Sequence, residues 1–197
     1  MPTRLLIIAA ATVLILGGAL GVTLISKGTT EAGGKALIGG PFALVDQTGK
    51  AVTEKDFEGS FMIAYFGYTF CPDFCPLGLS TITEALELLD DEEVERIKPV
   101  FFTVDPARDT VERLADYVSH FHPRLVGLTG TDEQVAAAAK AYRIYYNIPE
   151  HEGDDYPVDH STFTYLMDPD GTYAAHFSHD VSPEELAERL KTELKKG

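Results

Sequence analysis

The sequence predicts an α/β fold in which helices pack on a mixed sheet, and three observations lead to that prediction. The apolar runs at 61–66 and 99–104 are typical of buried strands, and a segment that reads as a helix follows each of them. The turn at 168–171 joins the runs 163–167 and 172–177 into a predicted hairpin. Strands that alternate with helices and end in an antiparallel hairpin are typical of an α/β sandwich.

The predicted elements can be placed in order along the chain. They are an N-terminal hairpin at 42–53, a strand at 61–66, a helix at 77–89, a strand at 99–104, a helix from 110, a strand at 125–128, a helix at 131–142, the hairpin at 163–177 and a helix from 182. Thr110 and Ser182 are expected to cap their helices. The polar segment 148–159 is too long for a simple turn, and such loops are often functional.

The N-terminus is expected to be a membrane anchor at residues 5–26, preceded by a cytoplasmic N-terminus at residues 1–4. The uncharged stretch Leu5–Ile25 would span about 31 Å as a helix, close to the roughly 30 Å hydrocarbon core of a bilayer. Arg4 favours the orientation in which the rest of the chain is exported. Small residues at 17–21 leave a cleaved signal peptide as the alternative.

The rest of the chain is expected to form one domain at 41–197, joined to the anchor by a flexible linker at 27–40 that is rich in Gly and Thr. A domain of this size buries enough surface to fold without a disulfide. The formal net charge of −15 argues against binding nucleic acid, because such binding depends on basic residues that displace counterions from phosphates and acidic residues predominate here.

The two cysteines of the chain, Cys71 and Cys75, are four residues apart and each is followed by a proline. They lie where a buried strand runs into a helix, and the unpaired N–H groups and dipole of a helix N-terminus lower the pKa of a thiol. Residues at this spacing on a helical turn bring their sulfur atoms within reach of one ion or of each other. The pair therefore predicts a redox centre or a site for a soft metal such as Cu(I) or Zn(II).

Six histidines are available as a further ligand. His160 is the strongest candidate because it directly precedes a predicted strand, and Asp159 is expected to accept its second ring proton. A structural histidine is the more ordinary reading of such a residue. The others are expected on the surface, in the polar loop or beside the terminal hairpin: His120, His122, His151, His176 and His179.

Three blocks of the sequence resemble the signature motifs of the Sco/SenC family. They are Gly67-Tyr-Thr-Phe-Cys-Pro-Asp-Phe-Cys-Pro76, Val104-Asp-Pro-Ala-Arg-Asp-Thr110 and Val158-Asp-His-Ser161, and the resemblance covers about residues 38–195. It implies a thioredoxin-like fold with insertions and copper bound by Cys71, Cys75 and His160. It also implies a membrane-anchored metallochaperone that delivers copper to the binuclear copper centre of cytochrome c oxidase subunit II, or keeps that centre reduced.

Supporting roles around the site are also expected. Asp73, Asp105 and Asp159 are candidates for carboxylates that orient or tune the ligands, while Tyr68 and Phe70 are candidates for its walls. Phe74, between the cysteines, departs from the family pattern with a bulky ring that is expected to shield the site. Ser161 stands where threonine is expected, which is a mild change.

Several alternatives to a copper carrier stay open. The runner-up is a thiol–disulfide reductase that keeps the cysteines of a copper acceptor reduced. A static disulfide, a structural zinc site and a peroxidase assisted by Arg108 are weaker. The partners expected are the copper acceptor and the lipid bilayer. The absence of an Arg- and Ser-rich transit segment favours a bacterial inner membrane with the domain in the periplasm.

Overall fold

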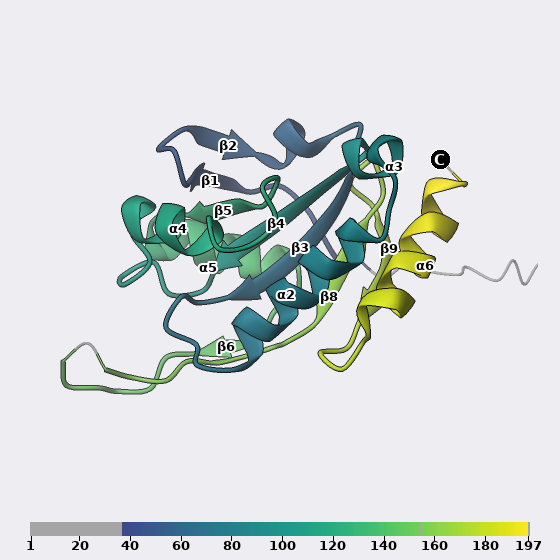
Figure 1. Cartoon of the computed structure of the whole chain (residues 1–197). Helices are drawn as coiled ribbons and strands as arrows, with labels where there is room; N and C mark the ends of the chain where they lie inside the picture. The colour runs from purple at the N-terminus through teal and green to yellow at the C-terminus, as the bar shows by residue number, and fades with distance from the viewer. Residues whose placement is uncertain (1–36, 154, 197) are drawn as a thin grey trace, which may run out of the picture. The chain divides into compact units, whose positions relative to one another are not determined.

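The computed structural model describes residues 37–153 and 155–196, which form an α/β domain around a seven-stranded sheet (Figure 1). The strands lie in the order β2-β1-β5-β4-β3-β8-β9. Their bounds are β1 Ala43–Asp46, β2 Ala51–Thr53, β3 Phe61–Gly67, β4 Ile97–Thr103, β5 Val126–Thr129, β8 Thr164–Met167 and β9 Tyr173–Phe177. The predicted mixed sheet is confirmed.

The middle of the sheet is parallel and its flanks are antiparallel. Strand β4 pairs in parallel with both β3 and β5, whereas β8 pairs antiparallel with β3, and β1 antiparallel with β5. Every residue of β3 is buried, which explains its unbroken apolar sequence, since helices cover both faces of a central parallel strand. The carboxyl ends of β3 and β4 therefore meet at one edge, where Gly67 pairs with Thr103.

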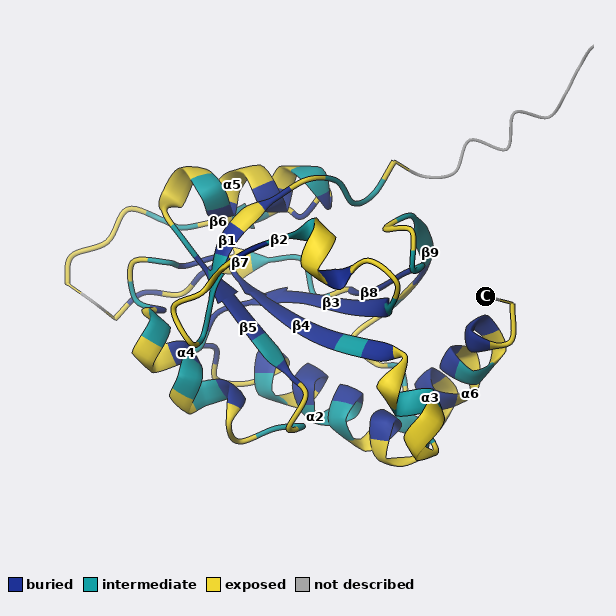
Figure 2. Cartoon of the chain, turned by 90° about the horizontal axis from the view of Figure 1, so that it is seen from above, coloured by how far each residue is buried: buried dark blue, intermediate teal, exposed yellow. Residues whose placement is uncertain are grey.

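The helices form layers on both faces of the sheet. Helix α5 (Asp132–Ala141) covers one face, while α2 (Phe74–Glu87), α4 (Val111–Val118) and α6 (Pro183–Leu194) cover the other (Figure 2). The 3-10 helix η1 (Glu54–Phe57) follows β2, and the short helix α3 (Asp91–Glu95) precedes β4. This arrangement is the α/β sandwich expected from the sequence.

Local capping interactions fix where the helices begin. The hydroxyl oxygen of Thr110 accepts from the N–H of Arg113 at the start of α4, and that of Ser182 accepts from Glu185 at the start of α6. Both caps were predicted, because a side-chain oxygen satisfies an N–H group that lacks a helical partner.

Three features were missed by the sequence analysis, the first being the 3-10 helix η1, which has only four residues. Helix α3 has only five residues, too few to show a helical period. Strands β6 (Tyr146–Asn147) and β7 (Asp159–His160) pair with each other in a separate two-stranded sheet, and the polar loop connects them. The predicted long loop is thus an arm closed at its base by β6 and β7.

The predicted anchor at 5–26 and most of the predicted linker lie outside the described residues. Among residues 37–153 and 155–196, no helix has the length and apolar character that crossing a membrane requires.

Candidate metal centre

The two cysteines lie where β3 gives way to α2. Strand β3 ends at Gly67, and Cys75 is the second residue of α2, so Cys71 lies in the connecting loop. The Cys75 side chain is fully buried and Cys71 is 9% exposed. The N–H of Cys75 donates to the sulfur of Cys71 at 3.4 Å, which points the free end of the helix at that sulfur.

The missing side chain of Gly67 makes room for one of these sulfurs. A Cβ atom at this position would lie 2.5 Å from Cys75 Sγ and 3.0 Å from a ring carbon of Phe101. Glycine at the end of β3 is therefore a steric requirement of the site.

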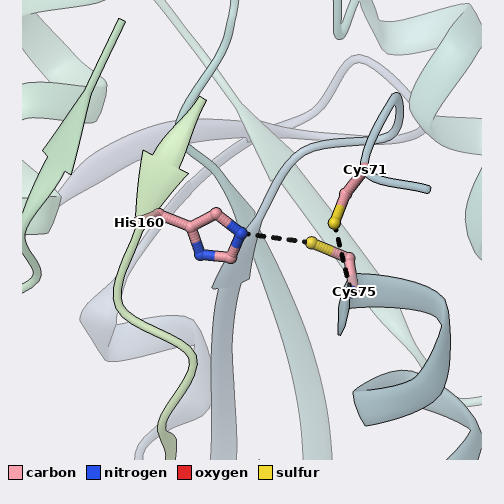
Figure 3. A group of neighbouring side chains, drawn as sticks. All are labelled: Cys71, Cys75 and His160. Atoms are coloured by element: carbon pink, nitrogen blue, oxygen red, sulfur yellow. Dashed lines mark hydrogen bonds between the residues drawn. The ribbon is translucent and has the colours of Figure 1, made fainter. Parts of the chain in front are cut away.

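Antiparallel pairing explains how a histidine from late in the chain reaches the cysteines. Strand β8 pairs Thr164 with Tyr65 of β3, so the residues just before β8 lie beside those that follow β3. His160 lies on β7, four residues before Thr164, and its Nε2 atom is 3.4 Å from Cys75 Sγ (Figure 3). The ligand atoms of Cys71, Cys75 and His160 all lie within 4.8 Å of one another. The structure therefore brings together the three residues predicted as metal ligands.

The hydrogen bonding of His160 determines which ring nitrogen is available. Its Nδ1 atom lies 2.9 Å from the carbonyl oxygen of Ser161. A carbonyl only accepts, so Nδ1 carries the proton of the neutral ring and Nε2 presents its lone pair to the sulfurs. The predicted partner, the Asp159 carboxylate, is exposed and plays no part in this bond. The expectation for Asp159 was wrong because the backbone of the next residue supplies the acceptor.

The two thiols have unequal acidities. A hydrogen bond from the Cys75 thiol lowers the pKa of Cys71, and hydrogen bonds from the N–H groups of Cys75 and Asp73 add to this effect. The same bond raises the pKa of Cys75, and burial raises it further. Cys71 is therefore the more acidic thiol of the pair and loses its proton before Cys75 does.

The other two predicted carboxylates lie in different places. Asp73 is exposed at the N-cap of α2, where its side chain makes no capping hydrogen bond. Its backbone N–H instead hydrogen-bonds to the Cys71 sulfur, which helps to lower the pKa of that thiol. Asp105 is fully buried and accepts from the Tyr156 hydroxyl at 2.9 Å and from Arg108. The Asp105 carboxylate therefore bonds to residues beside the site and not to a cysteine sulfur.

The predicted walls of the site are partly confirmed. Tyr68 is buried, and its ring meets the His160 ring edge to face at 5.7 Å. Phe70 turns outward and is 42% exposed, and the guanidinium carbons of Arg108 and Arg113 lie 4.7 Å and 4.0 Å from its ring centre. Phe74 is 49% exposed and contacts the ring of His179 edge to face, so it borders the opening and does not cover it.

A cavity of about 330 Å³ opens onto the ligands. Both segments line it: Tyr68, Cys71, Pro72, Asp73 and Phe74 from one, and Pro157, Val158, Asp159, His160 and Thr162 from the other. A different cavity, of about 210 Å³, lies at the start of β3, near Ser60 and Met62, and contains none of the three ligands.

The other histidines lie apart from this group. In the described part of the chain, Cys71, Cys75 and His160 form the one cluster of His, Cys or acidic residues with metal-binding geometry. His120, His151, His176 and His179 are exposed and His122 is half buried, so the surface position predicted for His122 was only partly right.

Two residues near the site were not singled out from the sequence. Gly67 had no distinguishing signal beyond its place at the end of an apolar run. Tyr156 had one, since it is the one aromatic residue in the polar segment 148–159. Its burial between Asp105 and Arg108 shows why an otherwise polar loop contains it.

Two soft sulfur atoms and one imidazole nitrogen suit a soft or borderline metal better than Ca²⁺ or Mg²⁺. The same dithiol also permits disulfide exchange. Comparison with known proteins identifies the family of the chain. Residues 30–195 match the model of the SCO1/SenC family. The chain belongs to the SCO1/SenC family.

Relatives in this family are similar over most of the described domain. The chain is 46% identical to the mitochondrial SCO1 homolog 1 of Arabidopsis thaliana, over 75% of this chain and 45% of that protein. It is 43% identical to the SCO2-like protein of Rickettsia felis, over 78% of this chain and 76% of that protein. The chain thus spans less than half of the plant relative.

The fold is also that of solved family members. The structure of yeast Sco1 with copper bound superposes with a TM-score of 0.76 at 40% identity, covering 81% of this chain and 90% of the yeast chain. The resemblance expected from the three sequence blocks is confirmed, as is the thioredoxin-like fold with additional elements.

Proposed function

We propose that this SCO1/SenC protein is a copper metallochaperone that carries Cu(I) on Cys71, Cys75 and His160. The observation that carries the proposal is the convergence of these three ligand atoms within 4.8 Å, on the fold of a family whose yeast member has been solved with copper bound. Thiolate and imidazole ligands match the softness of Cu(I).

The protonation states of the free site favour loading with a cation. Cys71 is the more acidic of the two thiols, and the hydrogen bond at Nδ1 of His160 leaves Nε2 of the neutral ring facing the sulfurs as a ligand atom. Cys75 must lose its proton when it binds, because the thiolate is the metal ligand. A complex of two thiolates, one neutral imidazole and Cu(I) carries one net negative charge.

Burial indicates from which side copper leaves. Cys75 is fully enclosed, whereas Cys71 and half-buried His160 border the cavity. An acceptor thiolate that enters the cavity reaches the metal beside His160, and the neutral imidazole is the ligand most readily replaced. Copper then passes to the acceptor by stepwise ligand exchange, with no change in oxidation state.

The surface around the cavity supports a protein acceptor. Phe70, Phe74 and Leu77 are 42%, 49% and 58% exposed, and each lies within two residues of a cysteine. Phe74 also lines the cavity, and exposed apolar side chains beside a binding site are typical of a protein interaction surface. As the acceptor we propose the binuclear copper centre of cytochrome c oxidase subunit II, which the family resemblance implies.

The same proposal includes a place for the protein in the cell. With residues 5–26 as a single-pass anchor in a bacterial inner membrane, the copper domain lies in the periplasm. The hydrophobic length of Leu5–Ile25 and the preceding Arg4 support this orientation.

A thiol–disulfide reductase is the second candidate, and one observation favours it. The pKa of Cys71 is lowered by the Cys75 thiol, so Cys71 is a ready nucleophile next to a second thiol. In that reaction Cys71 attacks a partner disulfide, and Cys75 then displaces the partner thiol, so the domain is oxidised as the partner is reduced.

Copper titration of the reduced, full-length chain separates the two functions. The copper carrier binds one equivalent of Cu(I) through two sulfurs and one nitrogen, and it transfers the metal to a metal-free subunit II domain whose cysteines are already reduced. Failure to load such an acceptor, together with rapid reduction of its disulfide form, would leave the reductase as the function.

A further inference from the structure

Two aspartates in the turn after β4 are fully buried, Asp105 and Asp109. Burying a carboxylate is unfavourable unless it is paired or well hydrogen-bonded, so two of them in one five-residue turn call for a physical reason. The N–H of Asp109 donates to the carbonyl oxygen of Asp105 at 3.0 Å, which holds the two residues in a fixed relation. Each carboxylate contacts a different one of the two segments that meet at the metal centre.

Asp109 binds the segment that carries the cysteines. It accepts from the hydroxyl of Thr69 at 2.6 Å and from the Thr69 N–H at 3.1 Å. Thr103, at the end of β4, donates to it at 2.6 Å. Thr69 lies two residues before Cys71, so these bonds fix the start of the cysteine loop on the edge of the sheet.

Asp105 binds the arm that carries the histidine. One of its oxygens accepts from the hydroxyl of Tyr156 at 2.9 Å, and the other pairs with Arg108. The guanidinium carbon of Arg108 lies 3.5 Å from the centre of the Tyr156 ring. Tyr156 precedes His160 by four residues, and the pairing of β6 with β7 at the base of the arm is only two residue pairs long.

Arg108 also reaches across to the cysteine side. Its guanidinium carbon is 4.7 Å from the ring centre of Phe70 and 5.5 Å from that of Tyr68, the residue that packs against His160. The Arg108 side chain is only 6% exposed, so its guanidinium is largely shielded from water. Cation–π contacts are stronger in such surroundings than at an exposed site.

We propose that residues 105–109 act as a positioning clamp that sets the distance between the His160 ring and the Cys71–Cys75 pair. Asp109 holds the cysteine loop and Asp105 with Arg108 holds the histidine arm, so neither segment shifts without the other. The role of the clamp in copper affinity rests on the proposed function; its role in holding the arm does not.

Tyr156→Phe is the most selective test, because it keeps the ring on Arg108 and removes only the hydroxyl that binds Asp105. In the full-length, reduced protein we expect the Kd for Cu(I) to rise about tenfold, as when a group that orients a metal ligand is lost. Tyr145→Phe is the matched control, since this tyrosine directly precedes β6 at the base of the arm and is 65% exposed. It should leave the Kd unchanged.

A double-mutant cycle separates positioning from general loss of stability. In a His160→Ala background, Tyr156→Phe should cause no further loss of Cu(I) affinity, because the ligand that it positions is gone. Thr69→Val removes the hydroxyl that donates to Asp109 on the cysteine side. It should weaken Cu(I) binding in both backgrounds. An equal loss from Tyr156→Phe in both backgrounds, or no loss in either, would overturn the clamp.

A measurement without copper separates this inference from the proposed function. The nuclear Overhauser effect between the rings of Tyr68 and His160 should be strong in the metal-free protein, weak in Tyr156→Phe and unchanged in Tyr145→Phe. If the protein failed to bind Cu(I) but showed this pattern, the clamp would stand and the copper carrier would fall. An unchanged effect in Tyr156→Phe would refute the clamp whatever the protein binds.

Discussion

Substitution of Gly67 by alanine tests whether the space beside Cys75 is a requirement of the metal centre. The added Cβ would lie 2.5 Å from Cys75 Sγ, whereas ordinary contacts begin at 3.4 Å. The sulfur must therefore move by roughly 1 Å, several times the deviation of about 0.2 Å that a metal–ligand distance tolerates. Phe101 blocks relaxation on the other side at 3.0 Å.

Two quantities should change in Gly67→Ala, and by different amounts. Overpacking of a core site should lower the free energy of unfolding by about 1–3 kcal/mol in urea denaturation. The Kd for Cu(I), measured by competition with a chromophoric chelator, should rise by about 10- to 100-fold. This is the loss of affinity seen when a metal ligand is no longer held in place.

Gly127→Ala is the matched control for this prediction. Its Cβ would lie 2.7 Å from Leu114 Cγ on α4, so it overpacks the same sheet without touching a sulfur. It should destabilise the fold similarly and leave the Kd near the wild-type value. If Gly67→Ala bound Cu(I) as tightly as Gly127→Ala, the steric argument would be refuted.

Two further predictions concern charge at the site. The pKa of Cys71 is lowered in the folded protein, whereas in the unfolded chain it has the ordinary thiol value of about 8.5. Below that pH the unfolded chain therefore binds a proton at Cys71 that the folded protein does not bind. The stability that Cys71 adds is for this reason lost as the pH falls. The unfolding free energy of the reduced protein, relative to Cys71→Ser, should therefore rise between pH 5 and pH 8 in urea titrations, and a flat difference would contradict the assigned thiolate. Asp159→Asn should change the Kd for Cu(I) by less than about twofold, because the exposed carboxylate does not contact His160; a tenfold loss would restore its expected role.

Local patterns in the sequence were enough for most elements of the fold. The start of α4 follows from Thr110 and that of α6 from Ser182, because a cap involves only neighbouring residues. Strands β6 and β7 could not be found in this way. Each has two residues, and their pairing joins positions 12 and 14 apart, Asn147 with Asp159 and Tyr146 with His160. Such pairing depends on the rest of the fold more than on strand propensity.

The same distinction applies to the site. Residue type and spacing identify some of its members, and only the folded structure identifies the contacts between the others. Cys71 and Cys75 stand out because of their spacing, and the family resemblance added His160. The error at Asp159 arose because the true acceptor is a backbone carbonyl, which every residue has and no sequence pattern marks. The link from Tyr156 to Asp105 spans 51 positions, and only the folded chain brings these residues together.

The most direct test of the central claim is X-ray absorption at the copper edge of the Cu(I)-loaded protein, for the wild type and for His160→Ala. The three-ligand site predicts two sulfur neighbours and one nitrogen neighbour in the wild type, and two sulfurs alone with weaker binding in the variant. The same coordination shell and the same affinity in both proteins would show that His160 does not bind the metal, and would contradict the copper site described above.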